Sequence, residues 1–265
     1  MDVQKALSDL FSLAGKTVLI TGAAGSIGSK VSAGLASVGA RMALCDINLK
    51  GLDAVKAGIE AAGGVAEAFE MDMLDLASIR SRVDDVVQHF SSVDVLINMA
   101  GINKRVYFAD GDEETFDRIM GVNLKGAHFL SQAVVKQMKR QQSGSIINIG
   151  SYNAVMMLGG CGVYGESKSG VLAMTRAQAI ELAPYGIRSN VVCPGHISTE
   201  LTAPLWNDPV KSRYLLDRIA MNRPGKPEDL LGTIILLASD ASSYISGAVF
   251  HVDGGCLAGG QPWDL

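Results

Sequence analysis

Two side chains that can handle protons, Tyr164 and Lys168, lie four residues apart in this chain. In a helix this offset places both on one face. An ammonium group beside a phenol favours the phenolate, which lowers the tyrosine pKa from its ordinary value of about 10. The spacing alone occurs by chance in many helices. We interpret it as a candidate general acid/base pair because Ser151 lies thirteen residues upstream and a glycine-rich turn lies near the N-terminus.

The glycine-rich turn joins an apolar run at 17–21 to a helical pattern at 26–39. Glycines let the backbone approach a phosphate, and a helix N-terminus supplies free N–H groups. Its place after the first predicted strand favours a nucleotide site, and the alternative is a structural turn. The residues predicted to line this site are Gly22, Ala24, Ser26, Ile27 and Gly28.

Asp46 follows the second predicted strand, eighteen residues beyond Gly28. A carboxylate there can accept hydrogen bonds from both ribose hydroxyls and would repel a 2′-phosphate, which favours NAD over NADP. The turn contains no basic residue, and Arg41 precedes the strand. Asp46 could instead be a turn residue. Asp72, with Met73 beside it, follows the third predicted strand and is a candidate for contact with the adenine; the alternative for Asp72 is a helix N-cap.

The elements that must position these residues alternate between strands and helices. The predicted strands are continuous apolar runs, as expected of strands buried on both faces of a parallel sheet. Right-handed crossovers then give an α/β, Rossmann-type doubly wound, seven-stranded parallel sheet with helices on both faces. We predict one domain over 1–265, with a substrate lid at 195–227. The strands are predicted at 17–21, 41–45, 65–70, 93–98, 145–149, 188–193 and 248–252, and the helices at 26–39, 48–62, 76–90, 113–141 (bent), 162–183, within 208–221, and 228–238.

The bulk properties exclude several classes of protein. A net charge of −4 gives no electrostatic case for nucleic acid. The histidines show no metal-ligand spacing, so we predict no metal. Residues 1–16 lack the apolar core of a signal peptide, and no apolar run approaches the roughly 18 residues that span a bilayer. The cysteines lie far apart, which is typical of free thiols in a reducing compartment, and we predict a cytoplasmic protein. They are Cys45, Cys161, Cys193 and Cys256.

Taken together, these motifs resemble the classical short-chain dehydrogenase/reductase family over almost the whole chain. The family's glycine motif corresponds to Thr21–Gly28, and its N-N-A-G element to Asn98-Met99-Ala100-Gly101. Its catalytic asparagine, serine, tyrosine and lysine fall on Asn123, Ser151, Tyr164 and Lys168. The P-G element is Pro194-Gly195-His196-Ile197-Ser198-Thr199, and Val252-Asp253-Gly254-Gly255 matches the exit from the last strand.

Two positions depart from the family pattern. Ser26 replaces the middle glycine of the turn, so its hydroxyl is expected to cap the helix or to bond a phosphate. Met99 replaces the second asparagine of N-N-A-G, which puts one hydrogen bond between strands in doubt.

The resemblance implies a role for each matched residue. Tyr164 would be the base for an alcohol proton, with its pKa lowered by Lys168 and by the oxidised nicotinamide. Ser151 would bind the substrate oxygen, and Asn123 would hold a water that connects Lys168 to solvent. The Ile197 backbone and Thr199 would hold the carboxamide. The cofactor-binding set is completed by Asn98, Ala100, Gly101, Pro194, Gly195 and Lys168.

The substrate is indicated less directly. Lys104, Arg105 and Asn153 would suit a carboxylate or a polyol, or else the two basic residues are solvated loop charges; His196 is a further candidate contact. The chain resembles most the branch of sugar-acid and polyol dehydrogenases, such as gluconate 5-dehydrogenase. The alternatives are a 3-oxoacyl thioester reductase, a group that mostly prefers NADP, and a non-catalytic NAD-binding scaffold or sensor. The family implies a homotetramer, and we predict separately that 261–265 reach a neighbouring subunit.

Overall fold

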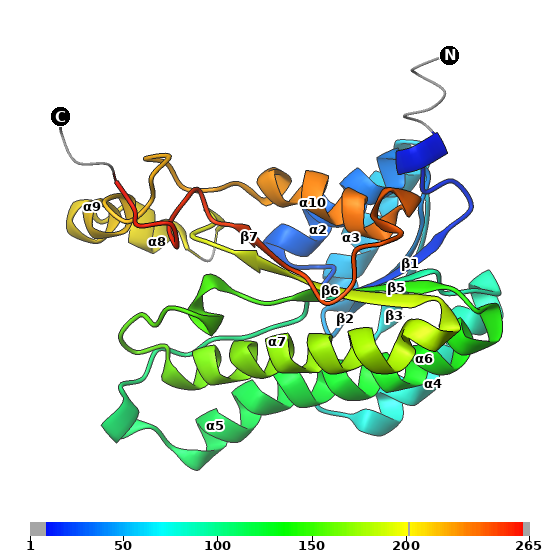
Figure 1. Ribbon diagram of the computed structural model, residues 1–265, viewed down its shortest axis with the longest axis horizontal. Coiled ribbons are helices and arrows are strands. Elements are labelled where there is room, and N and C mark those ends of the chain that lie inside the picture. Colours follow the sequence, from blue (N-terminus) through cyan, green and yellow to red (C-terminus); the bar gives the residue numbers. More distant parts are fainter. Residues whose placement is uncertain (1–8, 201, 262–265) are drawn as a thin grey trace.

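The computed structural model describes residues 9–200 and 202–261, and in them seven parallel strands form one sheet in the order β3-β2-β1-β4-β5-β6-β7. The predicted fold is therefore confirmed, and the ribbon in Figure 1 shows the sheet between two helical layers. The strands are β1 (Thr17–Thr21), β2 (Arg41–Asp46), β3 (Val65–Glu70), β4 (Val95–Asn98), β5 (Gly144–Ile149), β6 (Ile187–Pro194) and β7 (Val249–Val252).

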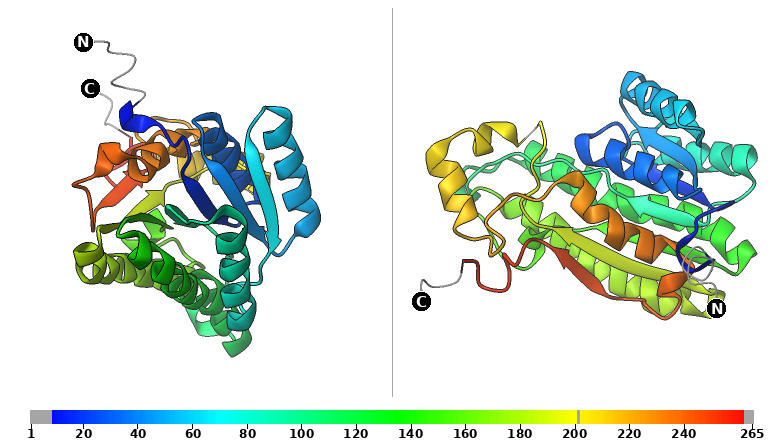
Figure 2. Two further views of the ribbon diagram at one scale, coloured as in Figure 1. Left: turned by 90° about the vertical axis from the view of Figure 1, so that its right-hand side faces the viewer. Right: turned by 90° about the horizontal axis from the view of Figure 1, so that it is seen from above.

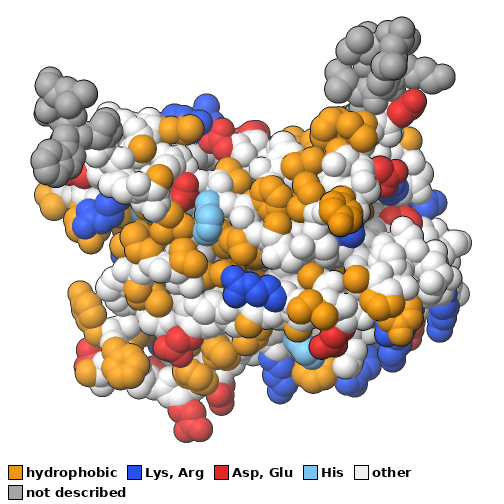
Figure 3. Space-filling model, viewed as in Figure 1, with side chains coloured by type: hydrophobic (Ala, Val, Ile, Leu, Met, Phe, Trp, Pro, Cys, Tyr) orange, Lys and Arg blue, Asp and Glu red, His pale blue; other side chains and the backbone are white. Residues whose placement is uncertain are grey.

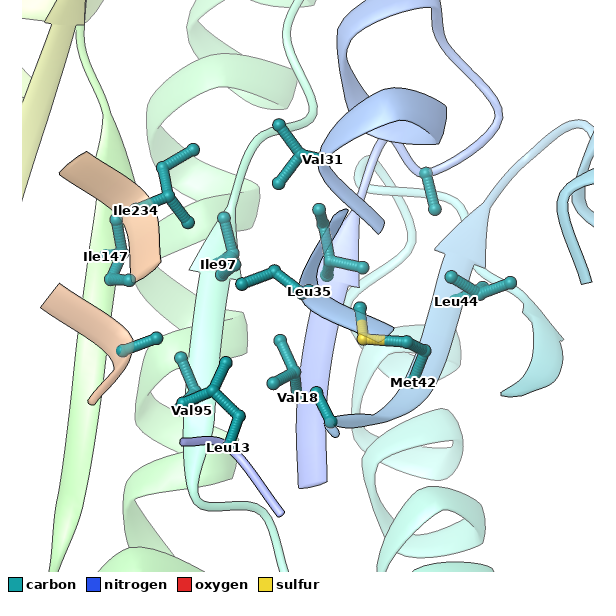
Figure 4. Close-up of a cluster of buried hydrophobic side chains, with 14 of the residues drawn as sticks. Leu13, Val18, Val31, Leu35, Met42, Leu44, Val95, Ile97, Ile147 and Ile234 are labelled. Atoms are coloured by element: carbon teal, nitrogen blue, oxygen red, sulfur yellow. The ribbon is translucent and has the colours of Figure 1, made fainter. Parts of the chain in front are cut away.

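The helices cover both faces of the sheet (Figures 1 and 2). One layer contains α2 (Ser26–Ser37), α3 (Leu49–Ala61) and α10 (Leu231–Ala238), and the other contains α4 (Leu76–Phe90), α5 (Glu113–Met120), α6 (Ala127–Gln141) and α7 (Gly162–Leu182). Within β1, Val18 and Ile20 belong to the core under α2 and α10 (Figure 4), whereas Leu19 belongs to the core on the opposite face. Because successive strand residues point to opposite faces, burying both faces requires a continuous apolar run.

The long helix predicted at 113–141 is interrupted. Between α5 and α6 the chain forms a π-helical segment, Gly121–Gly126. A Cβ at Gly126 would lie 2.5 Å from the carbonyl oxygen of Met73, so close packing of the backbone requires glycine there. π-Helical turns inside helices are often found at functional sites. Here the segment carries Asn123, and it explains the predicted bend.

The carboxyl ends of all seven strands point to one edge of the sheet, and the strand order reverses between β1 and β4. In doubly wound sheets ligands bind in the crevice beside this reversal. After β6, the predicted lid contains α8 (Ala203–Trp206) and α9 (Pro209–Leu216), which lie together at one end of the ribbon in Figure 1. The helix predicted within 208–221 corresponds to α9; α8 was not predicted.

The parts of the chain outside the described ranges include 1–8 and 262–265. Two predictions therefore lie largely outside the described residues. One is that residues 1–16 lack a signal peptide, and the other is that 261–265 contact a neighbouring subunit. Among the described residues, no helix is long and apolar enough to cross a membrane.

Candidate active site

The glycine-rich turn leaves the start of α2 open. Gly22 has φ +69°, and a Cβ there would lie 3.0 Å from the Cα of Ala100. The N-cap is Gly25, which has no side chain to bond the amides of the first turn. Ser26 is the first helical residue, so of its two predicted roles the helix cap is wrong, and the bond to a phosphate stays a prediction. Uncapped amides at a helix N-terminus suit a phosphate, and the turn therefore fits a dinucleotide.

Asp46 is held against this turn. Its Oδ2 accepts a hydrogen bond from the amide of Ala24 at 3.1 Å, and its Oδ1 accepts one from the amide of Asn48 at 3.0 Å. Arg41 lies at the other end of β2, where its guanidinium donates to Thr17 Oγ1 at 2.8 Å. Of the charged residues of β2, only Asp46 lies beside the glycine-rich turn, so β2 contributes a negative charge there.

Asp72 does not cap a helix, so its alternative interpretation is wrong. The N-cap of α4 is Asp75, which accepts from the amides of Ala77 and Ser78. Asp72 Oδ1 accepts from the amide of Leu74 at 2.9 Å, which orients Asp72 at the carboxyl end of β3, and Met73 beside it is buried.

The exit from β4 is tied to β1 in spite of the Met99 departure. Thr21 Oγ1 accepts from the amides of both Met99 and Ala100, each at 3.1 Å. Asn98 donates through Nδ2 to Asn148 on β5 at 2.7 Å. These contacts connect the strands on both sides of the reversal, so the side chain at position 99 is not needed for that connection.

Tyr164 and Lys168 lie on successive turns at the start of α7, as predicted. Lys168 Nζ is 5.7 Å from the centroid of the Tyr164 ring. It donates a hydrogen bond to the carbonyl oxygen of Ile149, at the end of β5, at 2.7 Å. The lysine side chain is therefore anchored to the strand that leads into Ser151.

The electrostatics of this pair differ from the prediction. Burial raises the pKa of Tyr164, and hydrogen bonding by Ser151 opposes that rise. Burial also lowers the pKa of Lys168 to about 8. The net shift of the tyrosine pKa is therefore upward in this structure, opposite in direction to the effect expected of Lys168 and the oxidised nicotinamide, because burial penalises both the phenolate and the ammonium group.

Asn123 joins three segments through its side chain. Its Oδ1 accepts from the amide of Ile102 at 2.8 Å, and its Nδ2 donates to the carbonyl oxygen of Ile102 and to Ser167 Oγ, both at 3.0 Å. A Cβ at Gly101 would lie 3.3 Å from Lys168 Nζ and 3.4 Å from Asn123 Oδ1. The missing side chain at 101 thus lets the lysine and the asparagine converge.

Ser151 follows β5 at the same edge. Its Oγ accepts from the amide of Asn153 at 3.1 Å. The Asn153 side chain is buried, and its Oδ1 accepts from the amide of Leu158 at 3.3 Å. The Asn153 side chain therefore stabilises the loop between positions 153 and 158.

The two basic residues after β4 separate. Lys104 Nζ donates to Thr115 Oγ1 at 2.8 Å and lies 3.7 Å from Asp112 Oδ2, at the start of α5. Arg105 is exposed, and its charge contributes to lowering the pKa of His196. Lys104 is thus engaged at the start of α5, whereas the charge of Arg105 acts on His196.

His196 is part of an aromatic wall that the sequence did not indicate. Its ring lies 4.7 Å from that of Tyr152 and 6.2 Å from that of Trp206 on α8, measured between centroids. Burial lowers the pKa of His196 to about 4, so the imidazole is neutral at pH 7. The sequence offered one indication of Tyr152 as a site residue, namely that it directly follows Ser151. Trp206 could not be placed because α8 was not predicted.

The remaining P-G residues meet the start of α8 and the exit from β7. Thr202, which was also missed, donates to the carbonyl oxygen of Ile197 at 2.9 Å and accepts from the amide of Thr199 at 2.9 Å. The amide of Gly195 donates to the carbonyl oxygen of Val252 at 3.0 Å, and a Cβ at Gly195 would lie 2.6 Å from the Cα of Asp253. Pro194 ends β6.

The fold thus places a glycine-rich turn with open helix amides, the carboxylate of Asp46 and a serine–tyrosine–lysine group along one edge of the sheet. This arrangement defines a dinucleotide-dependent oxidoreductase that handles an alcohol proton. No cluster of three or more metal-binding side chains was found among the described residues.

Comparison with known proteins supports the assignment of this chain as an oxidoreductase. Residues 22–256 match the family described as Enoyl-(Acyl carrier protein) reductase. The chain is 40% identical to the 3-oxoacyl-(acyl-carrier-protein) reductase of Thermotoga maritima, over 92% of this chain and 99% of that protein. It is 33% identical to the 5-keto-D-gluconate 5-reductase of Escherichia coli, over 95% and 99%.

A solved structure of a gluconate 5-dehydrogenase from Burkholderia cenocepacia, in complex with NADP and tartrate, superimposes with a TM-score of 0.92. It is 31% identical, and the match covers 95% of this chain and 99% of that one. The chain belongs to the short-chain dehydrogenase/reductase family. It is an NAD(P)-dependent oxidoreductase that acts on an alcohol or a ketone.

Proposed function

We propose that this protein is an NAD-linked dehydrogenase of sugar acids or polyols, with Asn123, Ser151, Tyr164 and Lys168 as its catalytic residues. The observation that supports this most is the Lys168–Ile149 hydrogen bond, which ties the helix carrying Tyr164 to the strand that ends before Ser151. Bound NAD would accept the hydride, and side chains of the protein would carry out all other steps.

Tyr164 takes the proton of the substrate hydroxyl, or returns it in the reverse direction. Ser151 donates a hydrogen bond to the substrate oxygen and stabilises the charge that develops there. Hydrogen bonding by Ser151 also favours the phenolate of Tyr164, against the effect of burial. The two hydroxyls therefore act on the same oxygen of the substrate.

Lys168 and Asn123 complete the path for the proton. A lysine with a pKa of about 8 can give up and regain a proton near neutral pH. The Asn123 side chain is engaged with Ile102 and Ser167, so the proposed water would be held by the backbone of the π-helical segment. Such segments leave backbone carbonyl groups outside the regular helical ladder.

The preference for NAD rests on Asp46. A carboxylate fixed by the amides of Ala24 and Asn48 accepts ribose hydroxyls and repels a 2′-phosphate. The Burkholderia relative was solved with NADP, so members of the family can bind that form. We propose that the charge of Asp46 decides the preference in this chain.

The proposed substrate contacts are Arg105, Ser151, Asn153, Tyr164 and His196. Arg105 offers a planar cation for a carboxylate, and neutral His196 offers a polar atom inside the aromatic wall. The carboxylates named in the relatives, gluconate derivatives and tartrate, suit this chemistry. Asn153 would contribute its side-chain NH2 group, while its oxygen accepts from the amide of Leu158.

A 3-oxoacyl thioester reductase is the second candidate, favoured by the 40% identity to the Thermotoga protein. The two functions are distinguished by turnover assays with NAD and NADP on sugar acids, polyols and 3-hydroxyacyl thioesters. Turnover of a sugar acid or polyol with NAD is expected. Activity confined to thioesters with NADP would replace the first function by the second, and cofactor binding with no turnover on the whole panel would favour a scaffold or sensor.

We also propose a homotetramer in the cytoplasm, with 195–227 acting as the substrate lid. Apolar side chains are spread over the face that carries α7, β7 and α10 (Figure 3), and Ile180 on α7 is 76% exposed. The bond from Thr202 to Ile197 connects the start of α8 to the P-G segment at the beginning of this lid. All four cysteines are free and buried, which is compatible with a reducing compartment.

A further inference from the structure

Ser167 is a fully buried serine between the two proposed proton-handling residues of α7. Its Oγ donates a hydrogen bond to the carbonyl oxygen of Tyr164 at 2.7 Å and accepts one from Asn123 Nδ2 at 3.0 Å. We propose that Ser167 is a positioning residue that fixes Asn123 to the turn of α7 carrying Tyr164. This proposal rests on the catalytic roles proposed for Tyr164 and Asn123.

Both hydrogen bonds require a hydroxyl group at position 167. The group must donate to a carbonyl and accept from an amide N–H, which serine and threonine can do and alanine cannot. At a site without solvent, the extra methyl of threonine has to displace packed neighbours. A cysteine keeps approximately the shape, but its thiol is a weak donor and acceptor.

The Asn123 side chain has two other hydrogen bonds, and both go to Ile102. Without the Ser167 hydroxyl, Asn123 stays attached to the loop after β4 but loses its direct bond to α7. Lys168 comes from α7, and the space that a Cβ at Gly101 would take lies between Lys168 Nζ and Asn123 Oδ1. The position of Asn123 relative to Lys168 thus depends on the only polar bond from its side chain to α7 among the described residues.

The test compares Ser167→Ala with Ser169→Ala. Ser169 lies on the same helix, is exposed, and donates to the carbonyl oxygen of Ala154 at 2.9 Å, so its variant removes a similar bond away from Asn123. Small displacements of positioning groups cost up to about a hundredfold in rate, and we expect kcat to fall about tenfold in Ser167→Ala. The KM for substrate and the affinity for NADH should stay within about twofold of wild type, because neither ligand touches Ser167.

The pH profile separates positioning from stability. In Ser167→Ala the hydrogen bond that holds Asn123 to α7 is lost, and the acid limb of the kcat profile should move to higher pH. Ser169→Ala should keep the wild-type profile, and so should a folded Ser167→Thr protein. Ser167→Cys should give intermediate values of kcat. A Ser167→Ala protein with a lowered melting temperature and an unchanged pH profile and kcat would overturn the proposal.

A double-mutant cycle with Asn123→Ala tests whether Ser167 acts through Asn123. If Ser167 acts through Asn123, the double variant loses no more kcat than the worse single variant, whereas losses that multiply would overturn the proposal. Hydrogen exchange provides a readout that does not need turnover: Gly121–Gly126 should exchange faster in Ser167→Ala and not in Ser169→Ala. If the wild type turns over none of the substrates, the proposed function fails, and unchanged exchange would show separately that this inference fails.

Discussion

The ammonium group of Lys168 donates a 2.7 Å hydrogen bond to the carbonyl oxygen of Ile149, two residues before Ser151. This bond connects the helix that carries Tyr164 to the strand that leads to Ser151, so it sets the relative position of two hydroxyl groups. It also holds a cation where water cannot reach it, which is why the pKa of Lys168 falls to about 8. A single contact thus has a geometric and an electrostatic consequence.

The lowered pKa of Lys168 predicts a dependence of stability on pH. Below pH 8 the lysine is protonated in the folded and the unfolded chain. Between the folded pKa of about 8 and the ordinary lysine pKa of 10.5, the unfolded chain binds more protons, so the free energy of unfolding rises with pH. At about 1.4 kcal/mol for each pKa unit, the difference between about 8 and 10.5 limits this rise to about 3 to 4 kcal/mol.

Urea unfolding from pH 7 to 11 measures this rise as the difference between wild type and Lys168→Met. The exposed Lys30 on α2 provides the control, and Lys30→Met should run parallel to wild type. If the Lys168→Met curve also runs parallel to wild type over this range, the burial argument is wrong.

Replacing Tyr164 by Phe should remove the acid/base group and little else. General acid/base catalysis contributes about 10²- to 10⁴-fold, so kcat should fall by about 10³-fold. Binding of NADH, followed by fluorescence, should be retained because the ring stays in place. Tyr244→Phe removes a phenol that is fully exposed, and it should leave both quantities unchanged. Turnover by Tyr164→Phe within tenfold of wild type would exclude the phenol as the proton-transfer group.

The sequence predicted the sheet well because its inner strands, such as β1, β4 and β5, are buried on both faces. In β1, Val18 and Ile20 pack under one helical layer and Leu19 under the other, and this produces an apolar run that is visible without a structure. Asp46, Asp72 and Ser151 lie at or just after strand ends, so their common edge was predictable from the parallel topology. The catalytic roles of Asn123, Tyr164 and Lys168, which lie in helical segments, came from the family resemblance.

What the sequence could not predict depends on contacts between distant segments. The apolar pattern continues through 113–141, and the π-helical segment arises where Gly126 meets Met73. Lys104 and Arg105 look equivalent until Thr115 and Asp112 engage the lysine. The direction of the Tyr164 pKa shift also depends on burial, which charge alone does not indicate.

Replacing Asp46 by Asn should weaken the preference for NAD. Asparagine keeps an acceptor oxygen for the amide of Ala24 but removes the charge that repels a 2′-phosphate. We expect the affinity for NADH to fall about tenfold and that for NADPH to rise, measured by fluorescence titration. Asp53→Asn, on the exposed side of α3, removes the same charge and should change neither affinity. Equal affinity of the wild type for NADH and NADPH would refute the carboxylate argument.

Gly101 and Gly58 provide a matched pair of glycine-to-alanine changes. A Cβ at Gly101 would lie 3.3 Å from Lys168 Nζ and 3.4 Å from Asn123 Oδ1, whereas a Cβ at Gly58 on α3 meets nothing within 4 Å. Gly101→Ala should push the lysine and the asparagine apart and lower kcat about tenfold. Gly58→Ala should raise the free energy of unfolding by about 0.5–1 kcal/mol, because alanine is the better helix former, and leave kcat unchanged.

Steady-state rates and urea unfolding on both variants decide this prediction. An unaltered kcat in a folded Gly101→Ala protein would mean that Lys168 and Asn123 can yield by a few tenths of an ångström without loss. The close approach of these two side chains would then be a feature of packing and not of catalysis.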